Sequence, residues 1–246
     1  LLKLGVLVVI FLMVLGVFST FSRGAFIGLS VFMISFWKNS DKKLFWLAII
    51  IIIISAAAYF MPDTWLTRMN TLENVSEDGS FMGRVIAWKI AILIAMDNFF
   101  GGGFKAVENI SVWHYYASFF YKLDFIPTAS AYPYFKATHS IYFQVLSNHG
   151  FFGLFLFLMV LITAFFKISK VNKLARKYQL DDWVIMLTKM LKLSLLSFVV
   201  SGAAVNVAYF DFLYVIFAMV VGLELRIAGQ IEGFDKVKKE SKLQGI

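Results

Sequence analysis

The sequence predicts an all-α fold, a polytopic bundle of transmembrane helices, and three observations support this. Hydrophobic residues make up 60% of the 246 residues, against about 45–50% in soluble domains. Charged residues make up 15%, against about 25% in soluble domains. Long apolar stretches also recur along the chain, separated by polar segments. This excess is too large to be explained by a bigger core, so we expect an integral membrane protein.

Six apolar stretches are the expected membrane spans. They lie at residues 4–18, 25–37, 44–60, 151–166, 187–207 and 212–225. About 20 apolar residues are needed to cross a bilayer squarely, so the shorter stretches must use polar flanking residues or cross at a thinned site. The chain begins inside an apolar run without Met, and we expect it to be the C-terminal part of a longer polytopic protein.

The expected spans divide the chain into four regions. Residues 1–60 hold three spans, 61–138 a long loop, 139–226 three further spans, and 227–246 a basic tail. Basic residues concentrate in three segments: three at 38–43, five at 167–182 and five after residue 225. The positive-inside rule places these segments in the cytoplasm. The long loop and the turns at Arg23 and Asp211 then share the outer side.

The formal net charge of +8 does not indicate nucleic-acid binding, because the basic residues lie beside hydrophobic spans. That placement is typical of contact with anionic headgroups, so membrane lipids are expected partners and nucleic acid is not. The chain has no cysteine, which excludes disulfides and thiolate metal sites.

Within the long loop, an apolar helix is expected at residues 81–96. Asp78 or Ser80 can cap its start, and Asn98 with the glycines at 101–103 can end it. The remaining loop is rich in aromatic residues and is expected to be ordered at the membrane interface.

Arg84 lies in the first turn of this helix, with Trp88 on the same face one turn later. An arginine near the positive end of a helix slightly opposes the helix dipole, which indicates an anion nearby. A salt bridge to the acidic pair at 77–78 is the structural alternative. Lys89 lies on another face and is expected to contact lipid headgroups.

Arg23 lies in a Ser-Arg-Gly turn at the outer end of the second span. Its planar guanidinium matches phosphate oxygens, and Gly24 would let a bulky group approach the backbone. An arginine that only reaches toward the membrane interface is the alternative.

His139 is expected at the start of a helix, with Tyr142 and Phe143 on the same side at spacings i+3 and i+4. An unperturbed pKa near 6.5 suits a general base or a partner of an anionic group. A polar interface anchor is the alternative. His149 is expected to cap or pack, and His114 to be an ordinary residue of the aromatic loop.

The glycines at 101–103 could hold a phosphate, but no strand precedes them and no P-loop Lys-Ser/Thr follows, so this signal is weak. The outer segment has no His/Asp/Glu cluster at ligand spacing. We therefore expect a metal-independent reaction in which arginines stabilise charge.

Three segments together resemble the O-antigen ligase and Wzy-type polymerase superfamily of bacterial membrane glycan ligases. They are residues 21–25 (FSRGA), residues 78–84 (DGSFMGR) with Trp88 and 102–104 (GGF), and residues 139–143 (HSIYF) with 149–153 (HGFFG). Within the superfamily, the stretches at 68–71, 78–80 and 139–143 are most similar to O-glycosylation ligases associated with exosortase systems. Asn148 departs from the pattern, since relatives often carry an acidic residue there.

The resemblance implies transfer of a glycan from undecaprenyl diphosphate to an acceptor hydroxyl, on the periplasmic face of the inner membrane. The acceptor would be a lipid A core or a protein, and no cofactor beyond the lipid-linked donor is implied. An inverting reaction is expected. A Wzy-type polysaccharide polymerase is the nearest alternative, and an anion transporter is a more distant one.

The resemblance also implies roles for individual residues. Arg23 and Arg84 match the arginines that hold the diphosphate, and His139 matches an essential histidine. The further residues expected to bind substrate are Trp88, Gly102, Gly103 and Tyr142.

Overall fold

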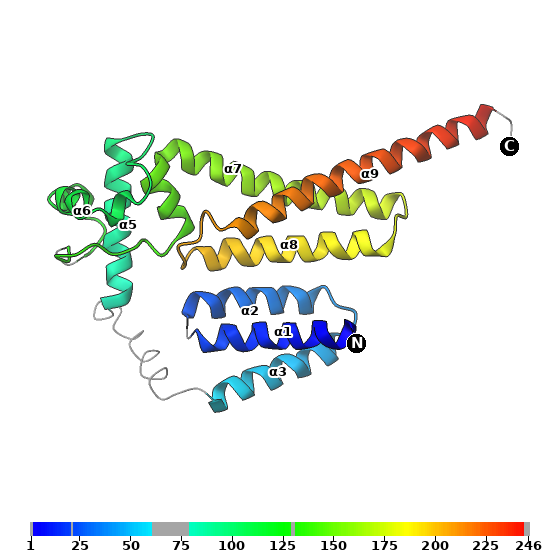
Figure 1. Ribbon diagram of the computed structural model, residues 1–246, viewed down its shortest axis with the longest axis horizontal. Helices are drawn as coiled ribbons and strands as arrows, with labels where there is room; N and C mark the ends of the chain where they lie inside the picture. Colours follow the sequence, from blue (N-terminus) through cyan, green and yellow to red (C-terminus); the bar gives the residue numbers. More distant parts are fainter. Residues whose placement is uncertain (1, 21, 61–78, 129–130, 244–246) are drawn as a thin grey trace. The chain divides into compact units, whose positions relative to one another are not determined.

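The structure is a computed structural model that describes residues 2–20, 22–60, 79–128 and 131–243. Within these ranges all regular secondary structure is helical, which confirms the predicted all-α class (Figure 1). The helices are α1 (Leu2–Ser19), α2 (Arg23–Lys38), α3 (Lys43–Phe60), α5 (Gly79–Asp97), η1 (Ala106–Glu108), α6 (Ile110–Ala117), η2 (Phe120–Leu123), α7 (Ile141–Lys177), α8 (Asp182–Gly202) and α9 (Asp211–Leu243).

The chain forms two compact units. One comprises Leu1–Leu156 with Val199–Ala208, and the other comprises Phe157–Phe198 with Tyr209–Ile246. The first unit contains α1 to α6, the start of α7 and the segment that follows α8. Every residue discussed below as part of the candidate site belongs to this unit.

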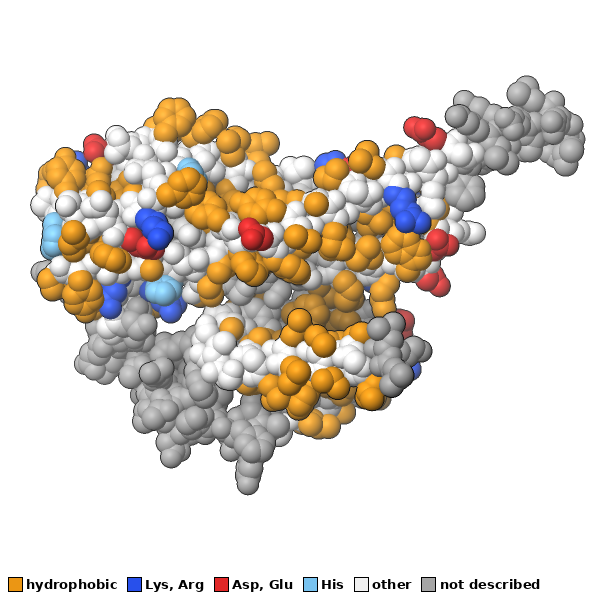
Figure 2. Space-filling view, in the orientation of Figure 1, with side chains coloured by type: hydrophobic (Ala, Val, Ile, Leu, Met, Phe, Trp, Pro, Cys, Tyr) orange, Lys and Arg blue, Asp and Glu red, His pale blue; other side chains and the backbone are white. Residues whose placement is uncertain are grey.

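In the part of the chain that the structure describes, three helices are long and apolar enough to cross a membrane: α7, α8 and α9 over Asp211–Gly233. Many apolar side chains of α7 and α9 are exposed, as lipid-facing residues are (Figure 2), whereas those of α8 are mostly buried or half-buried. Shorter apolar helices, Leu4–Ser19, Gly24–Lys38 and Lys43–Ser55, lie at the first three predicted spans. Three spans are therefore supported by length and composition, and the total of six stays a prediction.

The C-terminal half is more helical than predicted. The expected basic loop at 167–182 is mostly helix, because α7 continues to Lys177 and α8 begins at Asp182. The expected tail also continues α9 as far as Leu243. Lys, Arg, Glu and Leu all favour helix, so these spans extend into the polar segments without a break.

The fifth predicted span, 187–207, extends beyond the end of the observed helix. Helix α8 stops at Gly202, and residues 203–210 are not helical. A Cβ at Gly202 would lie 2.6 Å from Cδ1 of Ile141, so the glycine lets the start of α7 pass close to the end of α8. The freed segment 203–208 becomes part of the candidate site.

The connecting region, residues 79–140, has its own apolar core around α5. Ile86, Ile90 and Ala91 of α5 are fully buried, and they pack with residues of η1, α6 and η2. Trp113 of α6 is also fully buried, and its indole donates a 2.9 Å hydrogen bond to the carbonyl of Tyr132. Helix α5 includes the predicted helix 81–96, and nearly all of it is covered by protein.

Lys89 lies inside this core, which corrects the expected headgroup contact. Its side chain is 3% exposed. Its ammonium donates to the Ile126 carbonyl and the Thr128 hydroxyl, both at 3.3 Å, and lies 4.8 Å above the Phe120 ring. A buried ammonium needs such partners, so Lys89 fastens the loop at 126–128 to α5.

Two glycines bring the connecting region against α7. Gly150 interrupts α7 with φ 65°, and a Cβ there would lie 1.9 Å from the Phe99 carbonyl oxygen. A Cβ on Gly101, with φ 83°, would lie 2.4 Å from the Gly150 nitrogen. The two backbones therefore touch at a point where no side chain fits.

Candidate functional site

His139 lies in a turn at residues 138–140, before α7 begins at Ile141. The expectation that it starts the helix is wrong, so its i+3 and i+4 spacings to Tyr142 and Phe143 do not apply. Its φ is +44°, in the left-handed region that non-glycine residues adopt rarely and histidine more readily than most. The side chain is exposed, whereas Thr138 and Ser140 on either side are buried.

Hydrogen bonds hold this turn from two sides. The Trp88 indole of α5 donates to the Thr138 carbonyl at 2.6 Å, and its ring stacks on Phe143 with centroids 4.8 Å apart. The Thr138 hydroxyl bonds the Asn206 amide oxygen at 2.8 Å. A strained backbone persists only where its surroundings impose it, and these contacts impose this one.

Burial and three charged groups set the direction of the His139 pKa shift. Partial burial lowers the pKa of His139 below its ordinary value of 6.5, and the positive charges of Arg84 and Lys136 lower it further. The negative charge of Glu108 opposes this shift. The neutral imidazole therefore predominates near pH 7.

Lys136 is a site residue that the sequence analysis missed. Its ammonium lies 4.8 Å above the Tyr134 ring and 5.5 Å above the Tyr132 ring. A Cβ on Gly83 would lie 3.4 Å from its Cγ, so its stem passes beside Gly83 of α5, the residue that precedes Arg84 in sequence. The only sequence signal is a basic residue three positions before His139.

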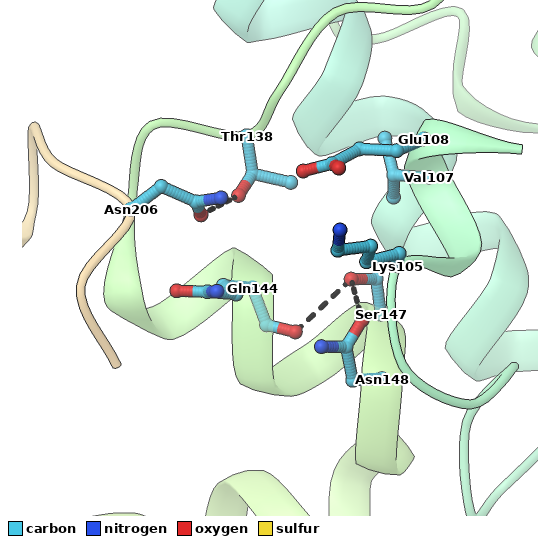
Figure 3. Close-up of a pocket in the computed structure, with 8 residues that line it drawn as sticks. All are labelled: Lys105, Val107, Glu108, Thr138, Gln144, Ser147, Asn148 and Asn206. Carbon is cyan, nitrogen blue, oxygen red and sulfur yellow. Dashed lines mark hydrogen bonds between the residues drawn. The ribbon is translucent and has the colours of Figure 1, made fainter. Parts of the chain in front are cut away.

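A small polar cavity of about 20 Å³ lies beside the turn, with room for about one water molecule. It is lined by Lys105, Val107, Glu108, Thr138, Gln144, Ser147, Asn148 and Asn206 (Figure 3). The Glu108 carboxylate points toward Thr138, which precedes His139 (Figure 3). Gln144 of α7 also accepts a 3.0 Å hydrogen bond from the Ala208 amide, which ties the 203–208 segment to α7.

Arg23 begins α2, and its side chain lies outside the described residues. Its neighbour Gly24 meets protein rather than open space, since a Cβ there would lie 2.9 Å from the Ala204 Cβ. Asn206, two residues further on, bonds Thr138. The start of α2 is therefore linked to the His139 turn through one short segment.

The other predicted substrate-binding residues contact protein. The amides of Gly102 and Gly103 donate to the carbonyls of Ser147 and Asn148, at 2.9 and 3.0 Å, and the Gly101 amide donates to Asn98. These amides are engaged, which argues against a phosphate cradle. The Tyr142 hydroxyl donates to the Val199 carbonyl at 2.8 Å and so joins the start of α7 to the end of α8.

The other two histidines, His114 and His149, are not part of this turn. His149 contacts Phe104 edge to face, with centroids 5.0 Å apart, in agreement with the expected packing role, and His114 is exposed on α6.

The alternative partners of Arg84 at 77–78 lie outside the described residues. Among described residues, no group of three or more His, Asp or Glu is placed to hold a metal ion.

Comparison with protein-family models gives a match to the O-antigen ligase family over residues 8–158. The matched stretch includes Arg23, Arg84 and His139. No curated protein and no solved structure matches the chain. Because the match covers more than half of the chain and the described helices include membrane-spanning ones, this membrane protein belongs to the O-antigen ligase family.

Proposed function

We propose that this protein transfers a glycan from undecaprenyl diphosphate to an acceptor hydroxyl, with Arg84, Lys136 and His139 at the reaction centre. The observation that carries the proposal is the turn at His139, whose left-handed backbone is fixed through the hydrogen bonds of Trp88 and Asn206 to Thr138. Burial and the positive charges of Arg84 and Lys136 lower the pKa of this histidine, which supports the proposal. These residues come from α5, from the segment before α7 and from the turn at 138–140. Membership of the family supports a lipid-linked glycan as substrate.

The chemistry requires little more than these groups. Diphosphate is already a good leaving group, so no strong general acid is needed. The acceptor oxygen bonds to the anomeric carbon, and the bond from this carbon to the phosphate oxygen breaks, leaving its electron pair on the diphosphate. Arg84 and Lys136 stabilise the charge on the departing diphosphate. His139 accepts the proton of the acceptor hydroxyl, for which it must be neutral.

Arg23 is proposed as a third cation for the diphosphate. The support is its position at the start of α2, next to Gly24 and the segment that reaches Thr138. Attack opposite the leaving group would invert the anomeric centre. A product with retained anomeric configuration would overturn the proposed stereochemistry. The reaction is proposed to be metal-independent, on the periplasmic face of the bacterial inner membrane, with a lipid A core or a protein as acceptor.

The test uses the full-length protein in its native host, with the lipid-linked glycan pool extracted and measured. At matched protein levels, Arg84→Ala and His139→Ala should each accumulate lipid-linked glycan and lose the glycosylated acceptor. His114→Ala is the matched control, since this exposed histidine lies on α6. Unchanged glycan transfer in both site variants would mean that Arg84 and His139 are structural.

The same site would serve a polymerase, in which the acceptor is a second lipid-linked glycan. A purified reaction separates the two functions when each acceptor is supplied alone. Product formed only with the lipid A core or protein supports the ligase, and product formed only between lipid-linked glycans supports the polymerase.

A further inference from the structure

A second and larger cavity lies at the far end of α5, outside the site described above. Its volume is about 270 Å³, slightly below the range of about 300–1,000 Å³ typical of small-molecule sites. Its buried base includes Leu93 and Tyr116, which are 3% and 8% exposed. Tyr115 and Met96 are each 56% exposed and border it. The cavity is therefore open to solvent and large enough for about one ring of a small ligand.

The lining combines aromatic faces with two charged groups. Tyr115 and Phe119 contact each other edge to face, with centroids 5.1 Å apart. Asp97 accepts a 2.9 Å hydrogen bond on one oxygen from the Tyr116 hydroxyl, and Asn98 donates to that hydroxyl at 3.2 Å. Burial and the bond to Asp97 raise the pKa of Tyr116 to about 12. Tyr116 therefore stays a donor and holds Asp97 in place.

These groups select among ligand classes by charge. Lys122 already places its ammonium 4.8 Å above the Phe119 ring, so a cationic ligand would meet a like charge there. An anionic ligand would meet the Asp97 carboxylate. A purely apolar ligand would desolvate both charges without replacing their hydrogen bonds. A neutral polyhydroxyl ring suits both the charged groups and the aromatic faces. Its hydroxyls can bond Asp97 and Lys122 while its C–H face covers an aromatic ring.

We propose that this cavity, lined by Asp97, Tyr115, Phe119 and Lys122, binds one neutral sugar residue of the glycan at a distance from the transfer site. Asp97 lies 13 positions after Arg84 on the continuous helix α5, which corresponds to about 20 Å along the axis at about 1.5 Å per residue. This spacing is too large for the transferred sugar itself. The cavity holds a sugar further along the chain, and the choice of a glycan as ligand rests on the proposed function.

The binding test uses the full-length protein in lipid nanodiscs and saturation-transfer NMR. The probes are methyl glycosides of neutral hexoses and N-acetylhexosamines, with choline and methyl glucuronide as cationic and anionic probes. At least one neutral glycoside should receive saturation on its ring C–H protons. Asp97→Asn and Tyr115→Leu should each weaken that signal about tenfold or more, because each removes a charged hydrogen bond or an aromatic face. Tyr115 is largely exposed, so its replacement preserves the fold.

Two variants control for position. Asp124→Asn and Phe125→Ala alter an exposed carboxylate and an exposed ring outside the cavity, and both should bind the glycoside like wild type. The proposal is overturned if no neutral glycoside gives a signal that depends on Asp97 and Tyr115. It is equally overturned if choline or the glucuronide gives that signal instead.

The binding readout is independent of glycan transfer. Arg84→Ala should reduce transfer by about 10²–10³-fold and leave glycoside binding intact. If Arg84→Ala transfers normally, the proposed function fails while the binding result still decides the cavity. If transfer falls in Arg84→Ala but no glycoside binds, only the cavity proposal fails.

Discussion

The indole of Trp88 donates a 2.6 Å hydrogen bond to the carbonyl of Thr138, 50 residues away in sequence. The next residue, His139, has a left-handed backbone, so one side chain of α5 helps to hold the turn that carries this histidine. This contact joins the helix that carries Arg84 to the proposed base.

Trp88→Phe keeps an aromatic ring near Phe143 but removes the N–H that fixes Thr138. We expect kcat to fall about tenfold or more, because small misplacement of a reacting group is costly. Steady-state kinetics on purified protein measures this. Trp113→Phe is the control, since it removes a matching indole-to-carbonyl bond, to Tyr132. Trp113→Phe should lower thermal stability and leave kcat near wild type, and an equal loss of kcat in both would contradict a positioning role for Trp88.

Replacing Arg84 or Lys136 should weaken the use of the lipid-linked glycan donor. Arg84→Ala should reduce kcat/KM by about 10²–10³-fold, the usual effect of removing one preorganised donor to a developing anion. Arg84→Lys should recover only part of this, because the ammonium lacks the bidentate fork. Lys136→Met should raise the donor KM. Lys173→Met, an exposed lysine of α7 in the other unit, should change nothing, and a comparable effect there would indicate a general charge effect.

The pH profile should report His139. The proposed base must be neutral to accept a proton, and the pKa of His139 is lowered below 6.5. Activity should therefore be full above pH 6.5 and should fall only at a lower pH. Lys136→Gln removes a charge that lowers this pKa, so the acid limb should move to higher pH. Glu108→Gln removes a charge that raises it, so the limb should move to lower pH. Profiles of kcat/KM between about pH 5 and 8 cover the range in which histidine titrates, and shifts in the same direction for both variants would exclude this assignment.

Gly150→Ala should destabilise the protein by about 1–3 kcal/mol or more, because a left-handed backbone is strained for alanine and the added Cβ would collide with the Phe99 carbonyl. Gly222→Ala in α9 is the matched control, with no atom within 4 Å of the added Cβ. It should stabilise by about 0.5–1 kcal/mol through helix preference. Thermal denaturation in detergent compares the two, and equal stability would show that the contact between Gly101 and Gly150 yields easily.

Local sequence patterns were sufficient to predict several features of this protein. Composition and apolar stretches predicted an all-helical membrane protein, because lipid requires each spanning segment to satisfy its own backbone hydrogen bonds. Capping residues and glycines indicated a helix at 81–96, and the structure has α5 over Gly79–Asp97. Short motifs around Arg23, Arg84 and His139 identified the superfamily that the family match confirms.

The surroundings of these residues depended on contacts between distant segments, which periodicity does not encode. The charges of Lys136 and Glu108 influence the pKa of His139 because η1, the segment before α7 and the turn at 138–140 fold together. Lys89 is buried because the loop at 126–128 covers it.

The sequence by itself determined the helical membrane fold and the residue types of the site, since hydrophobicity, caps and motifs are local properties. Only the tertiary structure decided that His139 lies before α7 with a left-handed backbone rather than within a helix. That conformation is unfavourable locally, and it is held by Trp88 and Asn206, which are 50 and 68 residues from Thr138 in sequence.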